Sequence, residues 1–149
     1  MTIEVVDLTD GEMIAVGPLR IRVLEDGSHT DHRLGVVEVT LPPHTGGPPQ
    51  HVHRQHDETF FVVSGTPSFI CGSERVEGRP GMFITAPIGT AHTFLNTADI
   101  PAVMLCTVTP DQYVGYFREL ANLPPGPPDP QMMGTIMSRY ATDVVHVTT

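Results

Sequence analysis

Residues 50–65, QHVHRQHDETFFVVSG, carry most of the information that this 149-residue sequence holds about fold and chemistry. His51 and His53 are two positions apart, so on a β-strand their side chains lie on one face. A short polar segment follows, and Glu58 then opens an apolar, β-prone run that ends at Gly65. A hairpin would return this carboxylate to the two imidazoles. Two histidines and one carboxylate suit Fe(II) and related divalent ions, so the stretch predicts a metal site.

A second stretch, residues 81–96 (GMFITAPIGTAHTFLN), supplies a third histidine. Gly81 and the unit Pro87-Ile88-Gly89 predict turns. His92 follows them at the start of a β-prone segment that ends at Asn96. For the first stretch, a solvated loop is the simpler interpretation of one isolated histidine, but it does not account for the spacing of His51, His53 and Glu58.

Together the two stretches resemble the cupin family. The family's first motif, HxH-(x3–4)-E-(x6)-G, fits residues 51–65, and its second, G-(x5)-P-x-G-x-x-H-(x3)-N, fits residues 81–96. The resemblance implies an antiparallel jelly-roll β-barrel of six to eight strands with one divalent metal ion inside it. The implied metal ligands are His51, His53, Glu58 and His92.

Two positions in the first motif need comment. Asp57 competes with Glu58 as the carboxylate ligand, because the family also permits the shorter spacing. We favour Glu58, since six residues then separate it from Gly65. The sequence also departs from the family at Thr45, which stands where a glycine usually precedes the first histidine.

The remaining residues up to about 109 have the same β character. Short apolar runs alternate with Gly, Pro and Asp turns, which predicts an antiparallel sandwich or barrel. No long helical segment interrupts them, which argues against a parallel α/β fold. The predicted strands are residues 16–24, 34–41, 59–63, 68–71, 82–85, 92–96 and 102–108.

The C-terminal part has a helical pattern instead. Thr109-Pro110 is typical of a helix start, and the proline-rich residues 123–130 end that helix. Asp129-Pro130 starts a second one. The sequence therefore predicts an all-β cupin barrel over residues 1–109, with a short helical extension packed on it over residues 110–149.

Composition narrows the possible functions. The formal net charge is −9 and the sequence contains no lysine, so binding to nucleic acid or to an anionic membrane surface is not expected. No apolar run is long enough to span a bilayer, and the N-terminal residues lack a signal-peptide pattern. We expect a cytoplasmic protein.

Cys71 and Cys106 lie in apolar, β-prone segments, which predicts two buried thiols.

Strand alternation extends the predicted site. Phe60 and Val62 share the face of the carboxylate, and Phe94 and Asn96 share the face of the third histidine. These four residues predict a mostly apolar pocket for a small molecule. Packing in the barrel core is the alternative interpretation of Phe60 and Phe94.

The other histidines carry weaker signals. His56 lies in the loop between the predicted ligands, where we expect it to be solvated; a position at the mouth of the cavity is the alternative. His29 and His32 are predicted at an exposed hairpin tip, and His44 is predicted to be structural or exposed.

Wider similarity suggests a reaction. Residues 41–51, 117–120 and 139–145 look like small bacterial single-domain cupins of the quercetinase-like group. This resemblance implies a dioxygenase that uses O2 on a flavonol-like or other enol-bearing aromatic substrate, with Glu58 as catalytic base. It also implies a homodimer, to which residues 3–16 can contribute an exchanged or edge-pairing strand.

Two other functions remain open. A cupin can be a non-redox isomerase, lyase or polyketide cyclase that uses Zn or Ni as a Lewis acid. It can also bind a small molecule without catalysis. The sequence does not distinguish Fe, Mn, Ni, Co, Cu and Zn, because occupancy also depends on metal supply in the cell.

Overall fold

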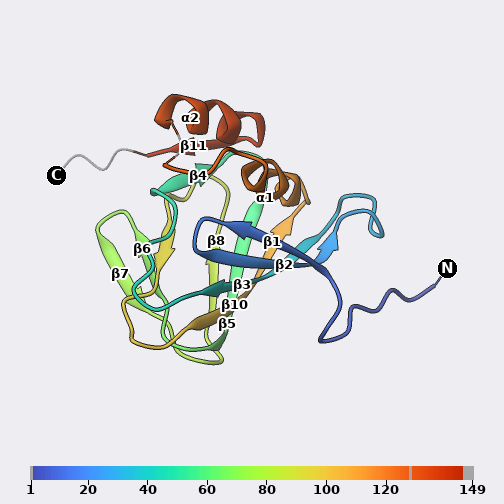
Figure 1. Ribbon diagram of the computed structural model, residues 1–149, viewed down its shortest axis with the longest axis horizontal. Helices are drawn as coiled ribbons and strands as arrows, with labels where there is room; N and C mark the ends of the chain where they lie inside the picture. Colours follow the sequence, from blue (N-terminus) through green and yellow to red (C-terminus); the bar gives the residue numbers. More distant parts are fainter. Residues whose placement is uncertain (1, 128, 146–149) are drawn as a thin grey trace.

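The computed structural model describes residues 2–127 and 129–145 (Figure 1). Within them the strands are β1 (Glu12–Val16), β2 (Leu19–Asp26), β3 (Gly35–Leu41), β4 (His51–His53), β5 (Asp57–Ser64), β6 (Ser68–Cys71), β7 (Glu74–Glu77), β8 (Phe83–Ala86), β9 (Thr93–Leu95), β10 (Ala102–Thr109) and β11 (Thr142–Val144). The helices are α1 (Val114–Ala121) and α2 (Pro130–Arg139).

The strands form two layers, and the described strands pair antiparallel throughout. The larger sheet has the order β1-β2-β3-β10-β5-β8. The other layer contains β7-β6-β9 and the pair β11-β4. A bridge between His51 and His92 joins these two pieces. The predicted all-β jelly-roll architecture is therefore confirmed.

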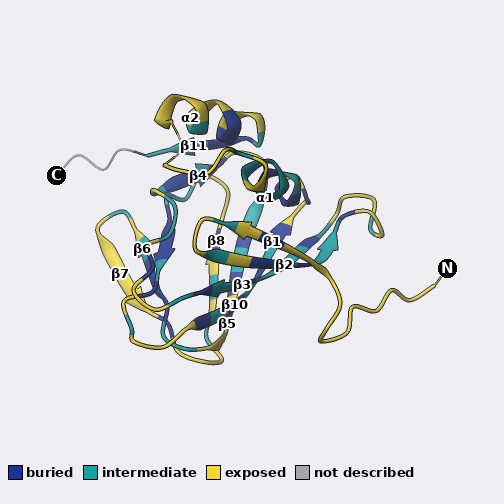
Figure 2. Cartoon of the chain, in the orientation of Figure 1, coloured by how far each residue is buried: buried dark blue, intermediate teal, exposed yellow. Residues whose placement is uncertain are grey.

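Alternating burial explains why these segments form strands. Inward side chains of β3 and β10, such as Val39 and Met104, are buried, whereas the residues between them are half-buried. In β5, Glu58 and Phe60 face inward and Phe61 is exposed. Figure 2 shows buried inner strands and exposed outer segments such as β7. The face of β5 that packs the core is thus the face that carries the predicted ligand.

Close backbone contacts position the chain just before β4. The amide nitrogens of Thr45 and Asn96 each donate to the other residue's carbonyl oxygen, at 2.9 and 2.8 Å. A Cβ at Gly47 would lie 1.8 Å from the carbonyl oxygen of Phe94, so only glycine fits there. The fold accommodates threonine at position 45, where the family motif has glycine.

The helices pack on one end of the barrel through a second apolar cluster. Its buried members are Val108, Tyr113, Tyr116, Ile136 and Met137. Val108 belongs to β10, so the barrel and both helices share this cluster. The start of α2 agrees with the sequence pattern: Asp129 accepts a hydrogen bond from the amide of Gln131, with Pro130 in the first turn.

The division into residues 1–109 and 110–149 stays a prediction, and residues 146–149 lie outside the described part.

The start of α1 differs from the prediction. Thr109 does not cap the helix, because β10 continues through it and pairs there with Asp57. Asp111 supplies the helix-start contacts instead. Its carboxylate accepts hydrogen bonds from the amides of Tyr113 and Val114, at 3.4 and 3.2 Å.

The chain does not remain helical after α2. Residues 142–144 form β11, which pairs with β4 and places Thr142 opposite His53. In Figure 1, α2 and β11 lie over β4 at one end of the barrel. The C-terminal segment therefore contacts the strand that carries two of the predicted metal ligands.

Three further sequence predictions can be compared with the fold. Cys106 is buried, but the prediction is wrong for Cys71, which is exposed where β6 ends beside the turn at Gly72. β1 pairs with β2 of the same chain at the sheet edge, so strand exchange stays a prediction. In the described residues, neither helix has the length and apolar character needed to cross a membrane.

Candidate metal centre

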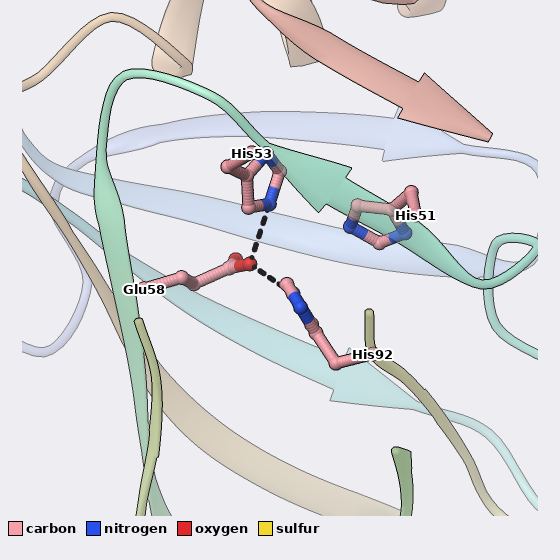
Figure 3. A group of neighbouring side chains, drawn as sticks. All are labelled: His51, His53, Glu58 and His92. Carbon is pink, nitrogen blue, oxygen red and sulfur yellow. Dashed lines mark hydrogen bonds and ion pairs between the residues drawn. The ribbon is translucent and has the colours of Figure 1, made fainter. Parts of the chain in front are cut away.

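Four polar side chains converge inside the barrel (Figure 3). β4 supplies His51 and His53, β5 supplies Glu58, and His92 immediately precedes β9. One possible ligand atom from each residue lies within 4.8 Å of the others. All four residues are buried, with exposed fractions of 2% to 7%. The structure thus brings together the four residues selected from the sequence.

The turn of the second motif holds these strands together. The amide of Gly89 donates to the carbonyl oxygen of His53, and the amide of Ile88 donates to the carboxylate of Asp57, both at 2.9 Å. Gly89 has a φ of +81°, which side chains disfavour. Asp57 is therefore bound to this turn, and Glu58 is the carboxylate of the cluster.

Hydrogen bonds at Nδ1 orient the imidazoles of His51 and His92. The Nδ1 atoms lie 2.9 Å from the carbonyl oxygen of Pro49 and 2.8 Å from that of Thr90, respectively. A carbonyl oxygen can only accept a hydrogen bond, so Nδ1 carries the proton in both rings. Each Nε2 therefore directs a lone pair to the cluster when the ring is neutral.

His53 is oriented by a residue from the other end of the chain. Its Nδ1 lies 2.8 Å from the hydroxyl oxygen of Thr142, and this hydroxyl donates to the carbonyl oxygen of Tyr140 at 3.0 Å. Because the hydroxyl proton is used in that second bond, the threonine accepts a hydrogen bond from Nδ1–H of His53. The Nδ1 atoms of all three rings thus carry a proton, and in a neutral ring the Nε2 lone pair faces the cluster.

Glu58 is the electrostatic centre of the cluster. Its Oε2 atom lies 2.8 Å from Nε2 of both His53 and His92, and its Oε1 accepts a hydrogen bond from the thiol of Cys106 at 3.0 Å. Burial by itself would raise the pKa of Glu58, but the bonds to the two histidines outweigh burial and hold this pKa well below its usual range. Although burial lowers the pKa of His92, the contact with Glu58 raises it overall.

This donor set fits a divalent cation. Burial lowers the pKa of His51 to about 4, so this ring is neutral near pH 7. An imidazole lone pair and a carboxylate oxygen 2.8 Å apart repel each other unless a proton or a metal ion lies between them. Three imidazoles and a carboxylate suit several divalent transition metals. The buried cluster is therefore compatible with a metal site and does not indicate which metal occupies it.

Comparison with protein families agrees with this geometry. Residues 37–108 match the family model described as "Cupin domain". The match runs from β3 to β10 and includes all four residues of the cluster. This chain contains a cupin domain.

Known proteins similar to this cupin have different functions. It is 24% identical over 118 residues to quercetin 2,3-dioxygenase from Bacillus subtilis (strain 168). The aligned region covers 79% of this chain and 34% of that relative. This cupin thus spans about a third of the relative's length.

Two solved structures support the fold. A sugar phosphate isomerase of the cupin superfamily from Silicibacter pomeroyi DSS-3 has a TM-score of 0.65 and 24% identity, over 71% of this chain and 75% of that one. KdgF from Halomonas sp. also has a TM-score of 0.65, with 19% identity over 73% of this chain and 94% of that one.

His56 does not have the predicted solvated position. It is 0% exposed, and its ring lies against that of His53 with a centroid separation of 4.1 Å. The ring of Tyr113 is 5.0 Å away. Burial, followed by the charge of His53, lowers the pKa of His56 to about 4.

Arg54 and Gln55, in the same connection, are exposed and point outward instead. The sequence did not reveal this, because side chains in a short connection follow no fixed alternation.

Phe60 and Phe94 lie beside the cluster of this cupin. The ring centroid of Phe60 is 6.2 Å from that of His92 and 5.6 Å from that of Phe94. Both phenylalanines are buried in the main core. Both side chains therefore face inward, and their role in a small-molecule pocket stays a prediction beside the alternative of core packing.

Val62 and Asn96 lie farther along the same strands. Val62 is four residues after Glu58, and Asn96 is four residues after His92. Four residues correspond to about 13 Å along a strand. The side-chain amide of Asn96 donates to the carbonyl oxygens of Leu41, Pro42 and Ile100. Its carbonyl oxygen accepts from the amide of Ala98, so this side chain is fully used in closing a loop.

Three side chains next to the cluster were not expected there from the sequence: Cys106, Tyr113 and Thr142. Alternation in β10 predicts that Cys106 faces inward, but only the pairing of β10 with β5 places it near Glu58. Three other histidines are exposed, as predicted: His29, His32 and His44.

Proposed function

We propose that this cupin is a metal-dependent dioxygenase that acts on a flavonol-like or other enol-bearing aromatic small molecule. The observation that carries the proposal is the convergence of three oriented imidazoles and an ionised carboxylate in a buried site. Similarity to quercetin 2,3-dioxygenase supports this reaction among those that such a site allows.

Each residue of the centre has a proposed role. His51, His53 and His92 would hold one divalent ion through Nε2, with Glu58 as the fourth ligand. When bound, the ion would supply Lewis acidity, and a redox-active metal would also permit reaction with O2. Phe60 and Phe94 would exclude water from one side of the centre.

Glu58 is the proposed catalytic base. Cys106 holds Oε1, so Oε2 is the oxygen that faces the histidines. An ionised carboxylate oxygen accepts protons, so Oε2 is the atom that can serve as the base. Oε2 would accept the hydroxyl proton of an enolic substrate that lies within hydrogen-bond distance.

The first test is metal analysis of protein purified without added metal, together with a His92→Ala variant. We expect about one Fe, Mn, Ni or Co per chain in the parent protein and a large loss in the variant. Stoichiometric zinc would instead favour isomerase, lyase or cyclase chemistry. A parent protein that also fails to bind added metal would refute the proposed centre.

The second test is O2 consumption with quercetin after reconstitution with each metal. The proposal expects substrate-dependent O2 uptake with at least one redox-active metal, and its loss in a Glu58→Gln variant that still binds metal. Turnover without O2, or no uptake with any metal, would exclude the dioxygenase.

We also propose that the protein is a homodimer. Strands β5 and β8 pair within the chain and place Phe61 directly opposite Phe83. These two side chains are 40% and 63% exposed. β8 is also an edge strand, which a second copy can cover. Sedimentation should give twice the chain mass, and Phe83→Asp should give a monomer. A monomeric parent protein would refute the dimer.

A further inference from the structure

His56 is a buried polar side chain whose hydrogen bonds are not accounted for. Its ring is 0% exposed. Among residues 2–127 and 129–145, no atom forms a hydrogen bond with either of its ring nitrogens. A phenylalanine would occupy a similar volume between aromatic neighbours without leaving polar atoms unpaired. The two nitrogens therefore point to a binding partner.

His56 lies directly beside the cluster of predicted metal ligands. The residue is in the connection between β4 and β5, and hence between His53 and Glu58. Its ring makes an angle of 31° with that of His53 at a centroid separation of 4.1 Å. Tyr113 lies 5.0 Å from His56 and 4.8 Å from His53. These rings hold the unpaired nitrogens in a defined place beside the metal centre.

We propose that His56 is a ligand-binding residue, in which one ring nitrogen hydrogen-bonds an oxygen atom of a small oxygenated molecule held at the metal centre. A neutral imidazole offers one donor and one acceptor, so one of its nitrogens can pair with either a carbonyl oxygen or an enol hydroxyl. Tyr113 gives this position an aromatic wall. The inference rests on the proposed function, because the ligand must lie at that centre.

The test uses the full-length, metal-loaded protein and maltol, a small hydroxypyranone with an enol hydroxyl next to a carbonyl. The His56→Phe variant keeps a flat ring against His53 but removes both nitrogens. His56→Gln restores a donor and an acceptor. We expect both variants to retain the parent's metal content. The dissociation constant for maltol should rise about tenfold in His56→Phe, as expected for one lost hydrogen bond, and less in His56→Gln.

A spectroscopic measurement covers the case in which His56→Phe does not fold. In the zinc-loaded parent protein labelled with ¹⁵N-histidine, maltol should shift the ring-nitrogen resonances of His56. The absence of such a shift would overturn the proposal, as would equal maltol affinity in the parent protein and a folded His56→Phe variant.

Other outcomes separate this proposal from the proposed function. His56-dependent binding of maltol without O2 uptake would remove the dioxygenase but support the role of His56. Loss of metal from His56→Phe, with metal retained by the parent, would show that His56 supports the metal centre instead. A metal-loaded parent protein that does not bind maltol would overturn the inference but leave the metal site in place. A parent protein that binds no metal would refute both.

Discussion

Hydrogen bonds at the imidazole Nδ1 atoms orient the three rings of the candidate centre. Two of the partners are carbonyl oxygens within two residues of the histidine, at Pro49 and Thr90. The third is the hydroxyl of Thr142, which is far from His53 in sequence. Local backbone thus orients two rings, while the C-terminal segment orients the third. Of the three predicted histidine ligands, His53 is therefore the one whose ring orientation depends on a residue far away in sequence.

Thr142→Val should weaken metal binding. Valine keeps the shape of threonine but leaves the buried Nδ1–H of His53 without its acceptor. We expect metal affinity to fall by about 10–100-fold, the usual effect of losing a partner that orients a ligand. Competition with a chromophoric chelator measures this affinity. Thr142→Ser keeps the hydroxyl and should bind metal as the parent does, so equal weakening in both variants would contradict the explanation.

At the scale of single elements, turns and interstrand contacts hold the ligand strands in register. Gly65 ends β5 with a φ of +74°. A Cβ there would lie 2.4 Å from the carbonyl oxygen of Pro101, just before β10. The motif glycine is therefore needed for both its backbone conformation and its close approach to the neighbouring strand.

Gly65→Ala should destabilise the fold by about 2 kcal/mol or more, from the left-handed backbone together with the steric clash. Chemical denaturation followed by circular dichroism measures the free energy of unfolding. Gly46→Ala is the matched control, because Gly46 has no neighbouring atom within 4 Å of an added Cβ. Equal stability of the two variants would show that the turn tolerates alanine.

Arg118 connects α1 to the first two strands. Its guanidinium forms ion pairs with Glu12 and Asp26, at 2.7 and 2.8 Å. Hydrogen bonds from Ser28 and then from Arg118 lower the pKa of Asp26. An aspartate whose pKa is lowered by folding stabilises the fold above its unfolded pKa, near 4, and loses this effect as the pH falls.

Arg118→Gln should therefore cost about 1 kcal/mol at pH 7, since partly exposed ion pairs are weak. The difference from the parent protein should shrink as the pH falls below about 4, because the unfolded chain then takes up a proton that the folded Asp26, with its lowered pKa, does not. Thermal unfolding across this pH range provides the measurement. Arg79→Gln, at an exposed arginine, is the control and should change little. A difference independent of pH would show that the ion pairs are not its cause.

At the scale of the whole molecule, the candidate centre joins parts of the chain that lie far apart in sequence. β4, β5 and the residue before β9 supply its side chains, and β11 supports them. A ligand that binds all of these parts stabilises the folded state as a unit, because the unfolded chain does not keep them together.

Metal binding should therefore raise the unfolding temperature. At a free metal concentration 100 times the dissociation constant, the gain is about 2.7 kcal/mol, or roughly 5–10 °C for a chain of this size. Differential scanning fluorimetry with Co or Zn measures the shift, and a chelator should reverse it. In His92→Ala the shift should be mostly lost. An equal shift in that variant would place the stabilising metal elsewhere.

The sequence alone determined the fold class and the composition of the cluster. Short strands with alternating burial, and two motifs with defined spacing, are local features that are visible in the order of residues. His51 and His53 share a face because strand geometry requires it. The choice of Glu58 over Asp57 followed from the spacing to Gly65.

Only the tertiary structure decided what surrounds the cluster. The sequence did not predict that His56 is buried, that Cys106 binds Glu58, or that Thr142 reaches His53 from β11. These contacts depend on which strands become neighbours and on how a short connection turns. Neither property has a period along the chain, because each results from packing between segments that are distant in sequence.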